Sequence, residues 1–291
     1  MKKLLKIILL SLSTLNIFVS CSNSEDPSSM LYPIENTIYS NLFDDKTQAE
    51  VLEELTIAGI PEANVEKFST WLNAYKDIQG NSKLPVGFLD YPIEPIIYGY
   101  EYNNNWNATK VNYSDVNSRL TAFLLFKDYI SSPSVILPAS EILAFDRSAI
   151  SNYDIVDFSE EDIDKFFNFF TEIPTDHSEN QAFHVNNIIK TWNDRGIKFT
   201  DSGDVSMINI FSHDPSSNLL FINHSAILVK TDYGYLLVDK HSPEYPYQAT
   251  RFKTREDVYT SLINRFSNDA NLGGSKPIYM ENSKFVNLDF I

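Results

Sequence analysis

The spacing of hydrophobic residues changes near Gly196, and this change divides the chain into two parts. Before Gly196, apolar side chains recur three and four positions apart, as they do on the buried face of an amphipathic helix. After it, short runs rich in β-branched residues alternate with turn residues, which is typical of antiparallel strands. The pattern predicts an α+β fold, in which a helical part (residues 31–196) packs on one face of an antiparallel sheet formed by residues 197–291.

Capping residues, glycines and prolines give these elements approximate ends. Residues 80–112 show no regular spacing, and their prolines, glycines and asparagines predict a long irregular segment with short strands near residues 95–98. The predicted helix over residues 116–130 is apolar on nearly every side, so we expect it to be buried. The other predicted helices cover residues 44–58, 61–75, 159–170, 178–195 and 254–266, and the strands cover residues 205–211, 219–230, 235–241, 247–252 and 277–280.

Residues 223–240 form the most informative pair of strands. Two apolar runs flank the short polar turn at residues 231–234, which predicts a β-hairpin. His224 opens the first strand and Asp239 closes the second, so both side chains lie at the same end of the hairpin. An imidazole beside a carboxylate is the arrangement of a histidine that an acid orients, and it directs attention to a nucleophile.

Ser118 lies near the start of the predicted buried helix, where backbone N–H groups favour an anion. The chain order Ser118, His224, Asp239 is the order of nucleophile, histidine and orienting residue in papain-like cysteine hydrolases. Asn112, six residues before Ser118, lies where such enzymes place the side-chain donor of the oxyanion hole. This analogy predicts a papain-like arrangement that acts on a peptide, an isopeptide or a cell-wall amide.

Several short motifs occur in an order and spacing that resemble a family of bacterial lipoproteins, domain of unknown function family 4300. They are Tyr39-Ser40-Asn41-Leu42, Ala58-Gly59-Ile60-Pro61, Asn117-Ser118-Arg119-Leu120-Thr121-Ala122-Phe123, Asn223-His224, Asp239-Lys240, Pro246-Tyr247-Gln248 and Met280-Glu281-Asn282. The resemblance implies a Cys–His–acid site, with a cysteine at position 118 and a glutamate at position 239. This chain has Ser118 and Asp239 there instead.

The exchange of cysteine for Ser118 changes the chemistry of the predicted site. A thiol beside a histidine ionises at neutral pH, whereas a hydroxyl must lose its proton as it attacks. Three explanations for Ser118 are open: an inactive homologue, an engineered substitution or a working serine variant. A structural alternative is open as well, in which Ser118 only caps a helix, His224 bonds to backbone, and Asp239 with Lys240 forms a solvated strand end.

The N-terminus has the pattern of a bacterial lipoprotein signal. Lysines precede a short apolar run in residues 1–20, and the only cysteine of the chain, Cys21, follows directly. Residues 18–21 resemble a lipobox, which predicts lipid attachment (palmitate) at Cys21, a polar tether over residues 21–30 and a location on the outer face of the bacterial cell membrane. An ordinary signal peptide with an unmodified cysteine is the alternative.

Charge and composition narrow the possible partners. The chain has a net charge of −16; removal of the signal leaves 39 acidic against 20 basic residues, a net charge of −19. Such a surface argues against nucleic-acid binding. The histidine spacing and the lack of phosphate-binding and calcium-binding motifs predict neither a metal nor a cofactor. The rival function is a non-catalytic surface lipoprotein that binds a ligand or protein through the aromatic segment 98–106. The sequence does not indicate an oligomeric state.

Overall fold

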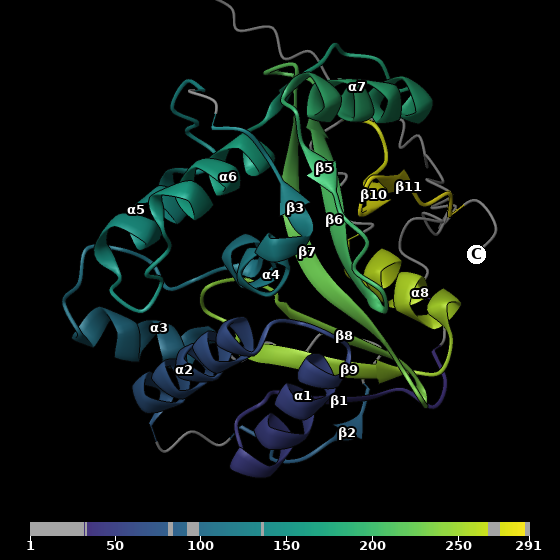
Figure 1. Cartoon of the computed structure of the whole chain (residues 1–291). Coiled ribbons are helices and arrows are strands. Elements are labelled where there is room, and N and C mark those ends of the chain that lie inside the picture. Colours follow the sequence, from purple (N-terminus) through teal and green to yellow (C-terminus); the bar gives the residue numbers. More distant parts are fainter. Residues whose placement is uncertain are drawn as a thin grey trace, which may run out of the picture. The chain divides into compact units, whose positions relative to one another are not determined.

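A large antiparallel sheet organises the part of the chain that the structure describes (Figure 1). The computed structural model describes Tyr32 and residues 34–80, 84–91, 99–134, 137–266 and 274–288, which all belong to the compact unit Leu31–Ile291. The predicted signal and tether, with Cys21, lie outside the described residues, as do the short strands predicted near residues 95–98.

Among these residues the main sheet has nine strands in the order β11-β10-β6-β7-β8-β9-β1-β2, and β4 also pairs with β7. Every pair in it is antiparallel. The strands are β1 (Ile38–Ser40), β2 (Leu89–Asp90), β4 (Ile173–Pro174), β6 (Val205–Asp214), β7 (Leu219–Thr231), β8 (Gly234–Lys240), β9 (Tyr247–Phe252), β10 (Ile278–Glu281) and β11 (Lys284–Phe285). A small second sheet joins β3 (Ile130–Ser131) to β5 (Lys198–Phe199).

Most helices precede the long strands in the sequence. They are α1 (Asp45–Ile57), α2 (Glu62–Gln79), α3 (Gly99–Ala108), α4 (Ser118–Phe126), the 3₁₀ turn η2 (Lys127–Tyr129), α5 (Ala144–Asn152), α6 (Glu160–Phe170), α7 (Gln181–Asp194) and α8 (Arg255–Phe266). The residues at which two predicted helices begin, Ser159 and Thr254, cap those helices by hydrogen bonds. The Ser159 hydroxyl accepts from the amide of Asp162 at 3.1 Å, and Thr254 and Asp257 bond reciprocally at the start of α8.

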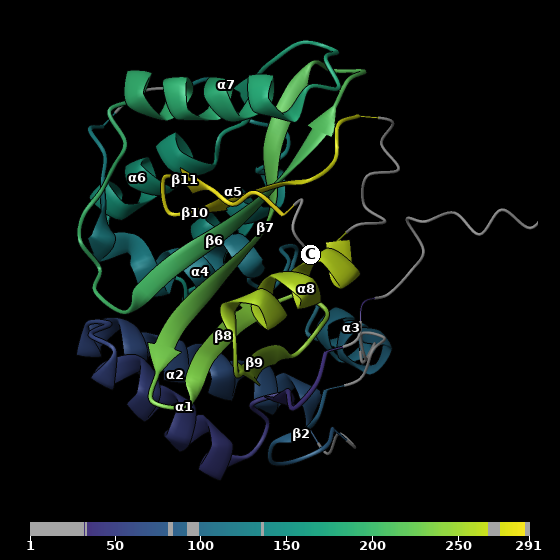
Figure 2. The same ribbon diagram turned by 90° about the vertical axis from the view of Figure 1, so that its right-hand side faces the viewer.

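The sheet carries a hydrophobic core on each face. The larger core contains the buried helix α4, with Leu120, Phe123 and Leu124 packed against Ile227 of β7 and Val238 of β8. The second core joins the other face of the sheet to α8 through Val258, Leu262 and Phe266, together with Ile208, Ala226 and Leu228. Figure 2 shows α8 on the opposite side of β7 and β8 from α2 and α4.

The α+β class and the packing of the N-terminal helices on the C-terminal sheet are confirmed. Four details differ from the sequence-based expectation. Helix α8 covers the second face, so the helices do not all pack on one side. Residues 80–112, predicted to be irregular, contain α3, and α5 was not predicted. The buried helix of residues 116–130 is shorter, because α4 ends at Phe126 and η2 tightens its last turn.

No helix in the described ranges combines the length and the apolar composition that crossing a lipid bilayer requires.

Candidate active site

The candidate site lies where strands β7 and β8 separate. Their pairing runs from Thr231–Gly234 to Ile227–Val238 and ends there, while β7 continues to Leu219 alongside β6. The pairing of β6 with β7 shifts register between Ile210 and Phe211, next to the position at which Ile210 pairs with His224. Side chains from the parted strand ends therefore meet side chains from other elements at this point.

Ser118 reaches this opening from the first turn of α4. The side chain of Asn117 caps the helix by accepting from the amide of Leu120 at 3.0 Å, which fixes Ser118 as the first helical residue. The hydroxyl of Ser118 accepts from the backbone N–H of Ser225 at 3.4 Å. Because that nitrogen is bonded to the carbonyl carbon of His224, Ser118 Oγ lies within about 6 Å of His224 Cα.

His224 and Asp239 meet across the separated strands, as the sequence predicted. Nε2 of His224 lies 2.9 Å from Oδ2 of Asp239, and the two side chains are 1% and 2% exposed. Burial by itself raises the pKa of Asp239. The positive charge of Arg265 and the hydrogen bond from His224 outweigh that effect and hold the pKa well below the usual value of an aspartate.

Arg265, in the last turn of α8, is a member of this group that the sequence did not reveal. Its Nη2 lies 2.8 Å from the Asp239 oxygen that also bonds His224, and Nη2 is 3.3 Å from Nδ1 of His241. Phe266 stacks near the imidazole of His224, with ring centroids 4.6 Å apart. Burial and the charge of Arg265 lower the pKa of His241 to about 3.

A buried ion pair ties the segment before α4 to the end of β8. Lys240, fully buried, bonds to the carboxylate of Asp115, and its ammonium lies 4.9 Å and 4.5 Å from the ring centroids of Tyr75 and Tyr247. Asp239 and Lys240 are therefore not a solvated strand end. Since Asp115 precedes Ser118 by three residues and Lys240 follows Asp239, this pair links the two parts of the candidate site.

A second ion pair, in which Arg119 is partly buried and Asp146 fully buried, holds the other side of the same helix start. Arg119 bonds through Nε to Asp146 Oδ1 at 3.1 Å and through Nη1 to the carbonyl of Ile222 at 3.2 Å. The side chain of Asn117 also donates to Asp146, at 2.7 Å. Asp146 is fully buried in α5, so these bonds connect α4 to α5 and to β7.

No hydrogen bond links Asn112 to Ser118 or Asp239 in the part of the chain that the structure describes. Asn112 is exposed in the turn after α3. Its role as an oxyanion donor stays a prediction. Thus His224 and Asp239 bond to each other, with Arg265 and Phe266 of α8 against them. Ser118 contacts the backbone next to His224 from α4, on the other face of the sheet.

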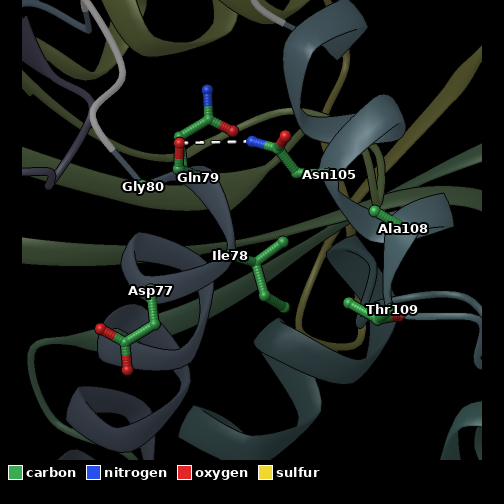
Figure 3. Close-up of a pocket in the computed structure, with 7 residues that line it drawn as sticks. All are labelled: Asp77, Ile78, Gln79, Gly80, Asn105, Ala108 and Thr109. Atoms are coloured by element: carbon green, nitrogen blue, oxygen red, sulfur yellow. Dashed lines mark hydrogen bonds between the residues drawn. The ribbon is translucent and has the colours of Figure 1, made fainter.

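A cavity of about 630 Å³ lies elsewhere, at the C-terminal ends of α2 and α3 (Figure 3). Its lining shares no residue with the candidate site. Figure 3 shows Ile78 of α2 directed toward Thr109, while an Asn105 amide donates to the backbone carbonyl of Gln79 at 3.4 Å. Of the aromatic residues in the predicted surface of residues 98–106, the one whose side chain is described is Trp106, which packs against Tyr113 and Tyr153.

No cluster of three or more His, Cys, Asp or Glu side chains suited to a metal ion occurs in the described ranges.

A family model described as "Domain of unknown function (DUF4300)" matches residues 38–286 of the chain. The match covers every element from β1 to β11, and with them Ser118, His224, Asp239 and Arg265. A search of curated proteins and a search of solved structures each found no match.

Proposed function

Because the chain belongs to the DUF4300 family, in which no activity is assigned, we propose from its own residues that it is a membrane-anchored lipoprotein with a papain-like site for acyl transfer or amide hydrolysis. In this proposal Ser118 occupies the position of the nucleophile. His224 is the base, Asp239 orients it, and Asn112 is the candidate oxyanion donor. The substrate class is a peptide, an isopeptide or a cell-wall amide.

One observation carries the proposal. The hydroxyl of Ser118 bonds to the amide of the residue that follows His224, while His224 itself bonds to Asp239. The start of α4 thus contacts the backbone of β7 next to the histidine, and the histidine bonds to the acid of β8, which supports the proposal. A serine that only capped its helix would not require a buried histidine–carboxylate pair beside it.

The bonds of His224 suit a general base. A carboxylate only accepts hydrogen bonds, so Nε2 carries the proton that bonds to Asp239, and Nδ1 is the nitrogen that takes up a proton from a nucleophile. The attacking Oγ of Ser118 would pass its proton to Nδ1 as it adds to the substrate carbonyl. The N–H groups of the first turn of α4 and the N–H of Ser225 favour negative charge at this place.

With serine at position 118 we expect little or no turnover. A serine hydroxyl depends on simultaneous proton removal, and a site that suits a thiolate supplies a weaker driving force for it. A cysteine introduced at position 118 should therefore be activated by the site. In a Cys21→Ser background, Ser118→Cys should react with iodoacetamide, and His224→Gln in the same chain should slow that reaction by about 100-fold.

Matched variants separate this effect from general thiol chemistry. Ser151→Cys, exposed at the end of α5, should react at the rate of a free thiol with or without His224. Thr121→Cys, fully buried in α4, should react slowly in both backgrounds. Equal labelling of Ser118→Cys before and after His224→Gln, with both chains folded by circular dichroism, would show that the two side chains do not form a site.

The lipid anchor is tested separately, because it depends on Cys21 and not on the fold. When the gene is expressed in a bacterium supplied with radiolabelled palmitate, the chain should be labelled and should sediment with membranes. Cys21→Ser should abolish the label and release the chain, whereas Ser22→Ala should change neither result. Retention of the Cys21→Ser chain in the membrane fraction without label would refute lipid attachment at this residue.

The cavity at the ends of α2 and α3 favours a second candidate function, the binding of a ligand without catalysis. Of the segment 98–106 singled out in the sequence, Asn105 lines this cavity, and the volume suits a small molecule. If Ser118→Cys shows no His224-dependent reactivity, this second function is the one that the structure favours.

A further inference from the structure

Asp239 uses a single oxygen for two buried partners. Its Oδ2 accepts from Nε2 of His224 at 2.9 Å and lies 2.8 Å from Nη2 of Arg265. The side chain of Arg265 is 5% exposed, and the other two are less exposed still. Two opposite charges at this distance, both removed from water, interact strongly, so each compensates most of the field of the other.

This compensation of charge changes how strongly Asp239 favours the protonated form of the His224 imidazole. A lone buried carboxylate at 2.9 Å would favour the protonated ring and keep the histidine cationic, which would prevent it from accepting a proton. Beside an Asp–Arg pair of zero net charge, the same oxygen still accepts the Nε2–H bond and fixes the ring. The imidazole is then oriented without being held in its charged form.

We propose that Arg265 is a positioning residue of the candidate site, which neutralises Asp239 so that His224 is oriented as a neutral base. The catalytic meaning of this role rests on the proposed function. The neutralisation of Asp239 by Arg265 rests on the geometry alone.

Within the described residues, the other charged or titratable groups near His224 come from the end of β8, from Tyr91 and from the segment before α4. His241, after β8, lies with its ring centroid 6.0 Å from that of His224, and burial together with Arg265 lowers its pKa. Burial lowers the pKa of Arg265, while interactions with Asp239 and Tyr91 raise it. From α4, the neutral Ser118 contacts the backbone N–H of Ser225, while the charge of Lys240 is compensated by Asp115. The Asp239–Arg265 pair is therefore the balance that substitutions should disturb.

Helix α8 is suited to hold the guanidinium in place. Val258 and Leu262 anchor the helix in the second core, and Arg265 lies in its last turn, where a positive charge is favoured by the helix dipole. The neighbouring Phe266 packs on the rings of both His224 and His241. The guanidinium therefore reaches Asp239 from a rigid element.

The test is the titration of the His224 ring in the full chain with Ser118 in place. The five histidines are labelled at carbon ε1 and followed by NMR from pH 4 to pH 9, and His224→Gln identifies the signal of His224. Arg265→Gln should move the midpoint of this signal upward by about one pH unit or more, because Asp239 is then uncompensated. Arg265→Lys keeps the charge and should leave the midpoint within about half a unit.

A double-substitution cycle keeps the test decisive where a single variant does not fold. Asp239→Asn alone should lower the midpoint by about one unit or more, since Arg265 then faces the ring without a counter-charge. Asp239→Asn with Arg265→Gln contains no buried charge pair and should return to within about one unit of the unsubstituted chain. A midpoint that Arg265→Gln leaves unchanged in both backgrounds, or a double variant about two units below the unsubstituted chain, would overturn the proposal.

These results are separable from the thiol labelling that tests the proposed function. The expected shifts without His224-dependent labelling would uphold the electrostatic role of Arg265 and remove the catalytic one. His224-dependent labelling in Ser118→Cys without any shift would keep the candidate active site and remove Arg265 from it.

Discussion

The chain buries two groups of histidines, and they differ in what their ring nitrogens contact. In the first group His184 of α7 and His213 of β6 lie with ring centroids 4.3 Å apart. In the second group His224 and His241 lie near Asp239 and Arg265. All four rings are withdrawn from solvent to a large extent, so burial alone does not separate a structural histidine from a candidate catalytic one.

Neutral partners occupy the nitrogens of the first group. His184 bonds to the carbonyl of Ser178 at 2.6 Å and to the hydroxyl of Thr175 at 2.8 Å. His213 bonds to the carbonyl of Asp176 at 2.9 Å and accepts from the amide of Ser275 at 3.0 Å. These bonds attach the loop of residues 175–178 to β6 and to the segment before β10, which is a structural role.

The second group instead connects an imidazole to a carboxylate and a guanidinium. A charged partner orients the ring and also changes how readily the ring takes up a proton, which backbone partners do to a smaller extent. The partner of the ring, rather than its depth of burial, therefore distinguishes a histidine that can act as a base from a histidine that holds a loop in place.

The largest effect that this comparison predicts is on stability. His213→Leu should lower the free energy of unfolding by about 3 kcal/mol, because the buried amide of Ser275 loses its acceptor and the ring contact with His184 is lost. His224→Leu should cost about 1 kcal/mol, since Asp239 keeps Arg265 as a partner. Urea unfolding followed by circular dichroism measures both values. A larger loss for His224→Leu than for His213→Leu would reverse the assignment of the two groups.

Much of the candidate site could be predicted from the sequence because its signals are local. The turn at residues 231–234 and the alternation on either side fix the hairpin, and the hairpin places His224 near Asp239. Asn117 and the apolar run after it fix the start of α4, and so the position of Ser118. No pattern in these residues predicts the contact between α4 and β7, and the papain-like arrangement stays a prediction.

The remaining members depend on contacts between distant segments. A lysine at the end of a strand is expected to be exposed to solvent. The burial of Lys240 depends on Asp115, which lies 125 positions away in the sequence. The amphipathic spacing of α8 predicts a helix but not the sheet face that it covers, so Arg265 gave no signal. Strand β1 has only three residues, too few to show alternation, yet it pairs with β9 near the edge of the sheet.

A smaller effect should appear in the pH dependence of stability, where the charged group differs again from the neutral one. Burial and the positive charge of Arg265 lower the pKa of His241 to about 3, below the unfolded value near 6.5. The unfolded chain then binds the additional proton first, so stability is complete above about pH 6.5 and is lost as the pH falls. For His241 this amounts to about 2 kcal/mol between pH 7 and pH 5. Asp239, whose pKa is lowered, loses its contribution only below about pH 4, outside this window.

His241→Phe keeps the ring that stacks on Tyr245 and removes the titration, so urea unfolding at both pH values should show the variant losing about 2 kcal/mol less than the unsubstituted chain. If the two chains lose stability in parallel, the acid sensitivity belongs to His184, whose pKa burial also lowers, and the neutral group would be the more sensitive one.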